Sequence, residues 1–247
     1  LGSMCTPVGN PQNLYLYFYY AMDLPSFLTL LLPYTLVSFL LLTLSLFRLP
    51  GTPIPISVRL AARRTRNLPV LAPSRRLWLL GGMFFLSLLT VAHVLDYRLT
   101  LAIVIVVTSL TRPRYFRYAD YRLLGTFVAF FILVGNMSQL PGFRDLLTGY
   151  LEGHEFLIAL LASQVISNVP EAVLLSGFTD EAAALLLGTD IGGLGTLIAS
   201  MASLISYGMY VRACPRQQGR YLKLFSLLNL AYLLVLVLIA WLYGFGV

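Results

Sequence analysis

Long apolar runs separated by short polar loops dominate the chain, and their lengths predict membrane helices. A bilayer requires about 20 apolar residues for one helical span. Residues 27–47, 77–95 and 224–243 meet this length, as does 123–134 with its flanks. The run 99–110 is shorter and spans only if it is tilted or partly covered by protein. The pattern therefore predicts an all-α, polytopic membrane protein.

Two further apolar runs are interrupted by small and polar residues. Residues 156–178 are apolar at both ends with Ser-Asn-Val-Pro in the middle, and two such short arms suit a re-entrant helical hairpin. Residues 181–211 begin as an apolar helix, pass through a glycine-rich stretch containing Asp190, and resume at Thr196. Unsatisfied backbone groups in hydrocarbon cost several kcal/mol each. We therefore interpret this broken helix as an ion or substrate site.

The basic residues are concentrated in three loops. Of the 17 Lys and Arg residues, the loops 48–76, 112–122 and 212–223 hold 7, 4 and 4. By the positive-inside rule these loops are cytoplasmic and the C-terminus is outside. Successive loops alternate between the two sides of the membrane only if 156–178 enters and leaves on the same side. The net charge of +7 thus reflects membrane topology and predicts no nucleic-acid binding.

Composition agrees with this class. Hydrophobic residues make up 58% of the chain and charged residues 11%, whereas soluble domains carry about 25% charged residues. Cys5 and Cys214 imply no disulfide framework. The sequence contains no nucleotide-binding loop, metal-binding cluster or catalytic triad pattern. We therefore expect neither an enzyme nor a primary pump, and no cofactor beyond a coupling Na⁺ or H⁺.

The N-terminus matches the broken helix at an offset of 190 residues. Residues 2–14 align with 192–204, sharing small residues, a threonine and then an apolar half-helix. The predicted topology makes the two segments run in opposite directions, which is typical of an inverted repeat with its site between the repeats. We therefore divide the chain into 1–47 (end of the first repeat), 48–76 (basic cytoplasmic linker) and 77–247 (second repeat). On this interpretation the chain begins within the first repeat, and we expect that it does not transport alone.

Two motifs resemble a known family. Ser-Asn-Val-Pro at 167–170, followed by Thr-Asp-Ile-Gly-Gly-Leu-Gly-Thr-Leu-Ile-Ala-Ser at 189–200, resembles the second repeat of the ion transporter superfamily. That group includes arsenite permeases, related sodium–proton antiporters, and sodium-coupled dicarboxylate and citrate symporters. Thr-Pro-Val-Gly-Asn-Pro-Gln-Asn-Leu at 6–14 resembles the matching first-repeat loop of bacterial anion permeases. The resemblance implies a homodimer that works by an elevator-like movement.

The dicarboxylate carriers have Ser-Asn-Thr at the hairpin tip, and this resemblance implies that the tip binds substrate carboxylates. Here Val169 replaces the threonine, so one hydroxyl is missing and a dicarboxylate substrate is less expected. The tip is closer to that of the arsenite permeases and antiporters.

The candidate site residues are small and polar. Asn168 could bind a cation or an anion, or simply cap the exit arm of the hairpin. Glu171 lies three residues after Asn168, which is the spacing of a capping box. A carboxyl group at membrane depth also suits proton coupling. Asp190 could bind a coupling cation or cap a helix end, and Thr196, the expected N-cap of the second half-helix, joins Asn168 as a candidate Na⁺ ligand. The full set is Thr6, Gly9, Asn10, Ser167, Asn168, Glu171, Asp190, Gly192, Gly193 and Thr196.

These features predict a secondary active transporter, an anion permease that moves a small inorganic or organic anion across the cytoplasmic membrane with Na⁺ or H⁺. The alternatives within transport are an arsenite efflux permease and a Na⁺/H⁺ antiporter. The alternative from another class is a non-transporting membrane scaffold subunit. The expected partners are membrane lipid, the anion and a second copy of the chain.

Overall fold

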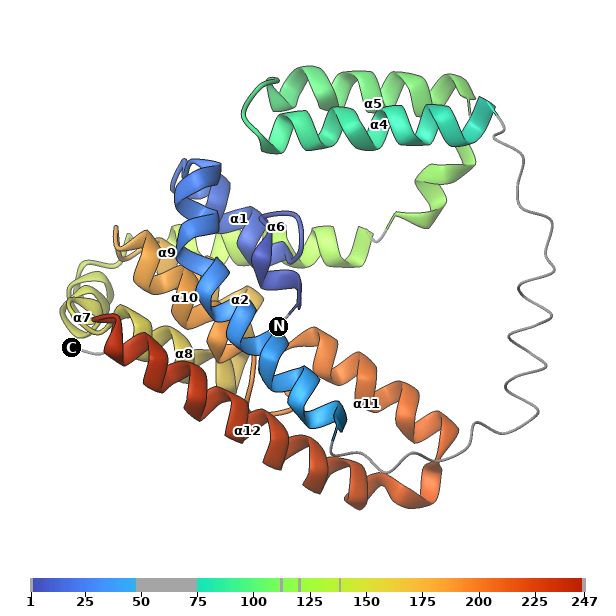
Figure 1. Cartoon of the computed structure of the whole chain (residues 1–247). Helices are drawn as coiled ribbons and strands as arrows, with labels where there is room; N and C mark the ends of the chain where they lie inside the picture. The colour runs from blue at the N-terminus through green and yellow to red at the C-terminus, as the bar shows by residue number, and fades with distance from the viewer. Residues whose placement is uncertain (1, 48–74, 112, 120, 138, 246–247) are drawn as a thin grey trace, which may run out of the picture. The chain divides into compact units, whose positions relative to one another are not determined.

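The structure is a computed structural model that describes residues 2–47, 75–111, 113–119, 121–137 and 139–245. These residues form helices and loops without a strand, as the sequence predicts (Figure 1). Most of the predicted linker 48–76 and the C-terminal Val247 lie outside the described residues. In chain order the elements are η1 (Gly2–Cys5), α1 (Pro11–Tyr19), α2 (Leu24–Phe47), α4 (Arg75–Val91), α5 (Tyr97–Thr111), η2 (Pro113–Tyr118), α6 (Tyr121–Met137), α7 (Pro141–Leu151), α8 (Glu155–Ile166), α9 (Asn168–Ser176), α10 (Ala182–Gly192), α11 (Met201–Ala213), η3 (Pro215–Gln217) and α12 (Gln218–Leu242).

Two of the described helical segments are long and apolar enough to cross a membrane. They are Leu24–Phe47 and Pro215–Leu242, which contain two of the predicted spans. The bent pair Leu124–Met137 and Gly142–Leu151 would provide a third, with an angle of 103° between its arms. Helices α4 and α5 are shorter apolar helices. These lengths fit a membrane protein, whereas the number of passes stays a prediction.

The chain divides into two compact units, Leu1–Leu42 with Asp120–Val247, and Thr43–Ala119. In the second unit α4 and α5 form an antiparallel hairpin, within which the buried hydroxyls of Thr90 and Thr100 lie 2.6 Å apart (Figure 1). The first unit contains the predicted hairpin, the broken helix and the N-terminal segment. It therefore holds every candidate site residue.

Helix α2 of the first unit has a defined start. Its N-terminus follows Asp23, whose Oδ2 accepts a hydrogen bond of 3.0 Å from the backbone N–H of Ser26. This bond lowers the pKa of the Asp23 carboxyl because it stabilises the charged form. A carboxylate at this position also interacts favourably with the positive end of the helix.

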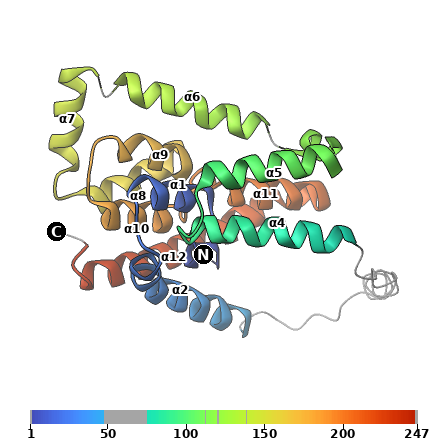
Figure 2. The same cartoon turned by 90° about the horizontal axis from the view of Figure 1, so that it is seen from above.

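Helices α8, α9 and α10 pack together at the centre of the first unit. Helix α1 lies against α9 and α10, α6 lies against α9, and α12 lies against α10 and α11 (Figure 2). The predicted hairpin is present as two helices, α8 and α9, that meet at Ser167. It stays a prediction that this hairpin enters and leaves the membrane on the same side.

Two glycines four residues apart allow α10 to approach α8 closely. A Cβ at Gly188 would lie 2.5 Å from the carbonyl oxygen of Phe156, and one at Gly192 would lie 2.9 Å from the Cα of Leu160. Small residues at this spacing are typical of close helix packing in membrane proteins. Backbone contact therefore sets the distance between α8 and α10.

The break in the broken helix 181–211 lies further along the chain than we predict from the sequence. Helix α10 continues through Gly188 to Gly192, the break comprises 193–200, and α11 begins at Met201. The prediction that Thr196 caps the second half-helix is wrong, since Ser200 does so and its Oγ accepts from the N–H of Ala202. The prediction failed because Gly188 and Gly192 allow close helix packing and stay helical. Only the later glycines of the cluster lie where the helix unwinds. The connector 135–155 also contains a helix, α7, that its polarity concealed.

The helix starts agree with the proposed repeat. Helix α1 begins at Pro11 and α11 at Met201, and the N-cap residues are Asn10 and Ser200. Both pairs keep the offset of 190 found in the sequence. The correspondence supports the register of the match, while the inverted orientation stays a prediction.

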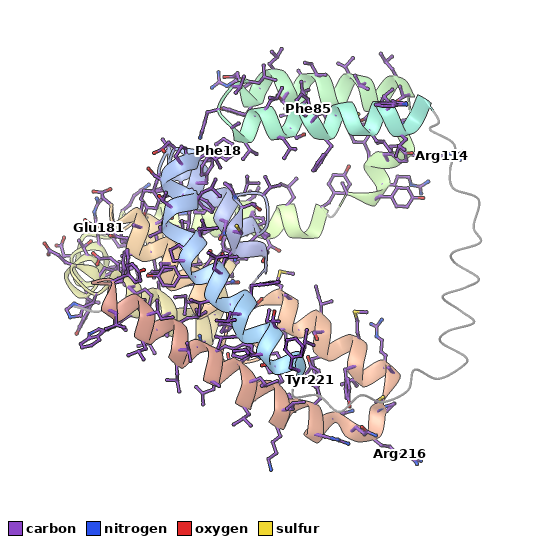
Figure 3. The ribbon with its side chains drawn as sticks, viewed as in Figure 1. Phe18, Phe85, Arg114, Glu181, Arg216 and Tyr221 are labelled. Atoms are coloured by element: carbon purple, nitrogen blue, oxygen red, sulfur yellow. The ribbon has the colours of Figure 1, made fainter. Side chains whose placement is uncertain are left out.

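Side chains of opposite charge lie near the two ends of α12. Three glutamates share a pocket with Gly244 and Phe245 just beyond its carboxyl end; they are Glu152, Glu155 and Glu181. The basic segment 212–223 lies at its amino end, and Figure 3 labels Arg216 there, far from Glu181. A helix of 25 residues is about 37 Å long at about 1.5 Å per residue. The two charged groups thus lie at opposite ends of α12, while the side of the membrane that each faces stays a prediction.

The contact between α8 and α10 generates a test of stability. We expect Gly188→Ala to lower the free energy of unfolding by about 1–3 kcal/mol, because the new methyl group overlaps the Phe156 carbonyl. Gly208→Ala in α11 is the matched control, since a Cβ there meets nothing within 4 Å. We expect that control to be neutral or stabilising by up to about 1 kcal/mol. Thermal unfolding of the purified variants in detergent measures both, and equal stability of the two would contradict the packing account.

Candidate functional site

A cavity of about 150 Å³ lies where the first-repeat segment meets the hairpin tip and the broken helix. Its lining comes from η1, the start of α1, the start of α9, the end of α10, the break and the start of α11. Three helices thus present their N-termini to one space. Helix N-termini carry partial positive charge and unpaired N–H groups, so they favour negatively charged groups.

Asp190 is the acidic side chain of this cavity. It is 8% exposed, and its Oδ1 accepts from the Nδ2 of Asn10 at 3.4 Å and from the Nε2 of Gln12 at 3.5 Å. Its Oδ2 is buried and has no hydrogen-bond partner among the described residues. The same is true of the Oδ1 of Asn13 on α1. Buried oxygens without a partner are rare in folded proteins and require an explanation, such as a bound ion or water.

No lysine or arginine of the neighbouring sequence can neutralise this carboxylate. Residues 1–47 and 145–211, which supply the whole lining, contain neither residue type. The charge of Asp190 is therefore opposed by amide side chains and helix N-termini. A cation at Asp190 would supply the positive charge that the lining lacks.

The hairpin tip is strained and is held by the break. Ser167 has φ 71° and ψ 149°, a conformation that is nearly confined to glycine and costs roughly 1–3 kcal/mol. The Asn168 N–H donates to the carbonyl oxygen of Ala199 at 3.0 Å, and the Ser167 hydroxyl donates to the same oxygen at 3.4 Å. A Cβ at Gly193 would lie 2.9 Å from the Asn168 side chain, so the tip and the break are closely packed.

Gln164, which the sequence analysis missed, binds much of the broken backbone. Its Nε2 donates to the carbonyl oxygens of Gly192 at 2.6 Å and Leu194 at 3.0 Å. Its Oε1 accepts from the N–H of Thr196 at 2.9 Å, and its own carbonyl accepts from the Thr196 hydroxyl at 3.1 Å. These bonds replace those that a continuous helix would make. Gln164 could have been found as a lone amide within the apolar run of the hairpin's first arm.

Glu171 does not form a capping box. It is 0% exposed, and its Oε1 and Oε2 lie 3.3 Å from the Thr189 hydroxyl and 3.2 Å from the Ser163 hydroxyl, respectively. The N-cap residue of α9 is Ser167 and not Asn168, and the Ser167 side chain makes no cap hydrogen bond. The capping interpretations of Asn168 and Glu171 are therefore wrong, because the Asn168 side chain lies against Gly193 of the break and that of Glu171 contacts α8 and α10.

The structure brings some predicted site residues together and separates others. Asn10, Asn168, Asp190 and Gly193 line the cavity. The other candidates do not line it. Thr6 and Gly9 shape the N-terminal turn, Ser167 and Gly192 support tip and helix packing, Glu171 lies between helices, and Thr196 is exposed beside Gln164.

Comparisons with known proteins identify two curated relatives. An uncharacterized transporter of Methanocaldococcus jannaschii is 29% identical over 240 residues, which cover 96% of this chain and 62% of the relative. The inner membrane protein YbiR of Escherichia coli is 30% identical over 214 residues, which cover 84% of this chain and 55% of the relative. The chain thus spans roughly three fifths or less of the length of each relative.

No family model and no solved structure matches the chain. Similarity to these two proteins, together with the apolar helices, supports a membrane protein. Neither relative's name refers to the ion transporter superfamily, so that resemblance stays a prediction.

The Gln164 contacts predict a local change in backbone protection. Gln164→Glu removes the N–H donors to Gly192 and Leu194 but keeps an acceptor for Thr196, so we expect faster amide exchange across 193–200. We also expect a loss of about 1–3 kcal/mol in the free energy of unfolding. The control is Gln139→Glu, at an exposed position between α6 and α7. Hydrogen–deuterium exchange measures the effect, and unchanged exchange in 193–200 would refute this role.

Proposed function

We propose that this chain is part of a secondary active transporter of the cytoplasmic membrane, and that the Asp190 cavity binds its coupling cation. Similarity to a protein named as a transporter and to an inner membrane protein supports the general class. The single observation that carries the site assignment is the buried, unpartnered Oδ2 of Asp190 in a cavity lined by both broken-helix segments.

The electrostatics of the cavity suggest how a cation and an anion are coupled. The N-termini of α1, α9 and α11 would favour an anion, but Asp190 already supplies a negative charge there. A second anion in this small space would be repelled by the first. A cation bound at Asp190 cancels that repulsion, after which the helix N-termini can hold the transported anion.

Binding of the cation before the anion would explain symport without any further binding site. The anion binds well only when the cation is present, and by thermodynamic reciprocity the anion strengthens cation binding by the same factor. The substrate would be a small inorganic or organic anion, because the cavity measures about 150 Å³. The homodimer and the elevator-like movement rest on the family resemblance alone, and the expectation of no further cofactor rests on the motifs that the sequence lacks.

A Na⁺/H⁺ antiporter is the second candidate. It is favoured by the same carboxylate, because the lining contains an acid and neither lysine nor arginine. Such a site could alternate between a metal cation and a proton without binding an anion. Dependence of Na⁺ binding on added small anions separates the two candidates, since only the symporter predicts it.

Cation binding can be measured on the purified chain, which carries the described residues that line the cavity. We expect ²²Na⁺ to bind to the wild type and Asp190→Asn to weaken binding at least tenfold, because the variant replaces the carboxylate with a neutral amide. Asp180→Asn, an exposed acid before α10, is the matched control and should bind as the wild type does. A ligand at 100 times its Kd stabilises a protein by about 2.7 kcal/mol, so Na⁺ should also raise the unfolding temperature of the wild type and the control.

Equal ²²Na⁺ binding by the wild type and Asp190→Asn would refute the site. Binding by neither the wild type nor the control would refute Na⁺ as the coupling ion at this cavity.

A further inference from the structure

Glu171 lies outside the cavity, enclosed between α8, α9 and α10. Its side chain is fully buried, and its two oxygens meet the hydroxyls of Thr189 and Ser163. It does not line the Asp190 cavity. The coupling cation described above therefore leaves this carboxyl group without a role.

The hydroxyls of Ser163 and Thr189 have too few protons to donate a hydrogen bond to each oxygen of an ionised Glu171. Ser163 has one hydroxyl proton, and its Oγ lies 2.9 Å from the carbonyl oxygen of Ala159 and 3.2 Å from the Oε2 of Glu171. If the nearer acceptor takes this proton, the contact with Oε2 is a hydrogen bond only when Glu171 itself carries a proton and donates it to Ser163. Thr189 then donates to Oε1, the carbonyl oxygen of the acid. The neutral acid satisfies all three groups at once.

The electrostatic surroundings of Glu171 also match the neutral form. Of the helices packed against α9, α10 contributes the acidic Asp190, and α8 contributes only Glu155, eight residues from Ser163. Helix α1 contributes Tyr15, whose hydroxyl pairs with Ser176, and α6 has no titratable residue in 124–137. No lysine or arginine is present in 145–211. An ionised Glu171 would thus face the like charge of Asp190 without a counter-ion.

Thr189 and Asp190 connect this acid to the cavity. They are consecutive residues near the end of α10, and Thr189 contacts Glu171 while Asp190 contacts the amides of α1. A cation at Asp190 would favour the ionised form of Glu171 through the low-dielectric interior. By reciprocity, a proton on Glu171 would weaken cation binding at Asp190.

We propose that Glu171, Ser163 and Thr189 form a proton-binding site separate from the Asp190 cavity and linked to it through α10. The linkage rests on the proposed function, whereas the proton site itself does not. Its reaction is the release of one proton from the carboxylic acid to water. The carboxylate that remains accepts from Thr189 and competes with the Ala159 carbonyl oxygen for the single hydroxyl proton of Ser163.

Infrared spectroscopy of the purified chain detects the bound proton. We expect the carbonyl band of a neutral carboxylic acid at neutral pH, its loss in Glu171→Gln, and its persistence in Asp190→Asn. The control Glu181→Gln, at an exposed acid, should leave the band unchanged. Thr189→Val should move the band to higher frequency, because the acid's carbonyl loses its donor, and this variant keeps the test decisive if Glu171→Gln fails to fold. Absence of the band, or its loss only in Asp190→Asn, would overturn the proposal.

Proton release tests the linkage. We expect NaCl added to the weakly buffered wild-type chain to release protons, detected with a pH indicator dye, and Glu171→Gln to release up to one proton per chain less while still binding ²²Na⁺. Equal release by both would overturn the linkage. If the wild type binds no ²²Na⁺, the proposed function fails, and the infrared band alone still decides whether Glu171 holds a proton.

Discussion

The backbone groups freed at the break between α10 and α11 must find partners within the protein, because lipid offers none. Gln164 binds two carbonyls and one N–H of this break, and the hairpin tip binds a third carbonyl through Asn168. The hairpin and the broken helix therefore form one hydrogen-bonded body. This requirement fixes where α9 and α11 begin, and so it places their positive ends at the cavity.

The same body separates two acids with different surroundings. Asp190 faces amide side chains and the cavity and keeps one oxygen unpaired, whereas Glu171 is enclosed by helices and meets two hydroxyls. Neither has a lysine or arginine in the segments 1–47 and 145–211. A carboxylate with a free oxygen in a cavity suits a metal cation, and an enclosed carboxyl with too few donors suits a proton. A metal cation at Asp190 of α10 and a proton at Glu171 of α9 would thus be bound on either side of the contact between Thr189 and Glu171.

Much of this arrangement was predictable from the sequence. The lengths of the apolar runs and their polar interruptions indicated the helical class, the hairpin 156–178 and the existence of a break. The repeat offset of 190 was also informative, because the starts of α1 and α11 keep it. The position of the break was not predictable, since glycine serves both close packing and unwinding, and Gly188 and Gly192 pack while Gly195 unwinds with φ 102°. The helix α7 was hidden by the polar composition of its segment.

The candidate residues divide in the same way. Asn168 and Asp190 reach the cavity because helix ends carry them there, whereas Thr196 is turned to Gln164 by a hydrogen bond that no local pattern encodes. The partners of Glu171 come from α8 and α10, so its environment depends on tertiary packing and not on its spacing from Asn168. Long-range hydrogen bonds of this kind are outside the information in a single sequence.

The central claim is that the free oxygen of Asp190 binds the coupling cation, and crystallography with a heavy monovalent cation tests it most directly. A crystal of the purified chain grown with a thallium(I) salt in place of sodium would reveal bound ions by their anomalous scattering. The account predicts a peak within coordination distance of the Asp190 Oδ2, in the cavity between α1, α9 and α11. An empty cavity, or a peak only in the pocket of Glu152, Glu155 and Glu181, would contradict it.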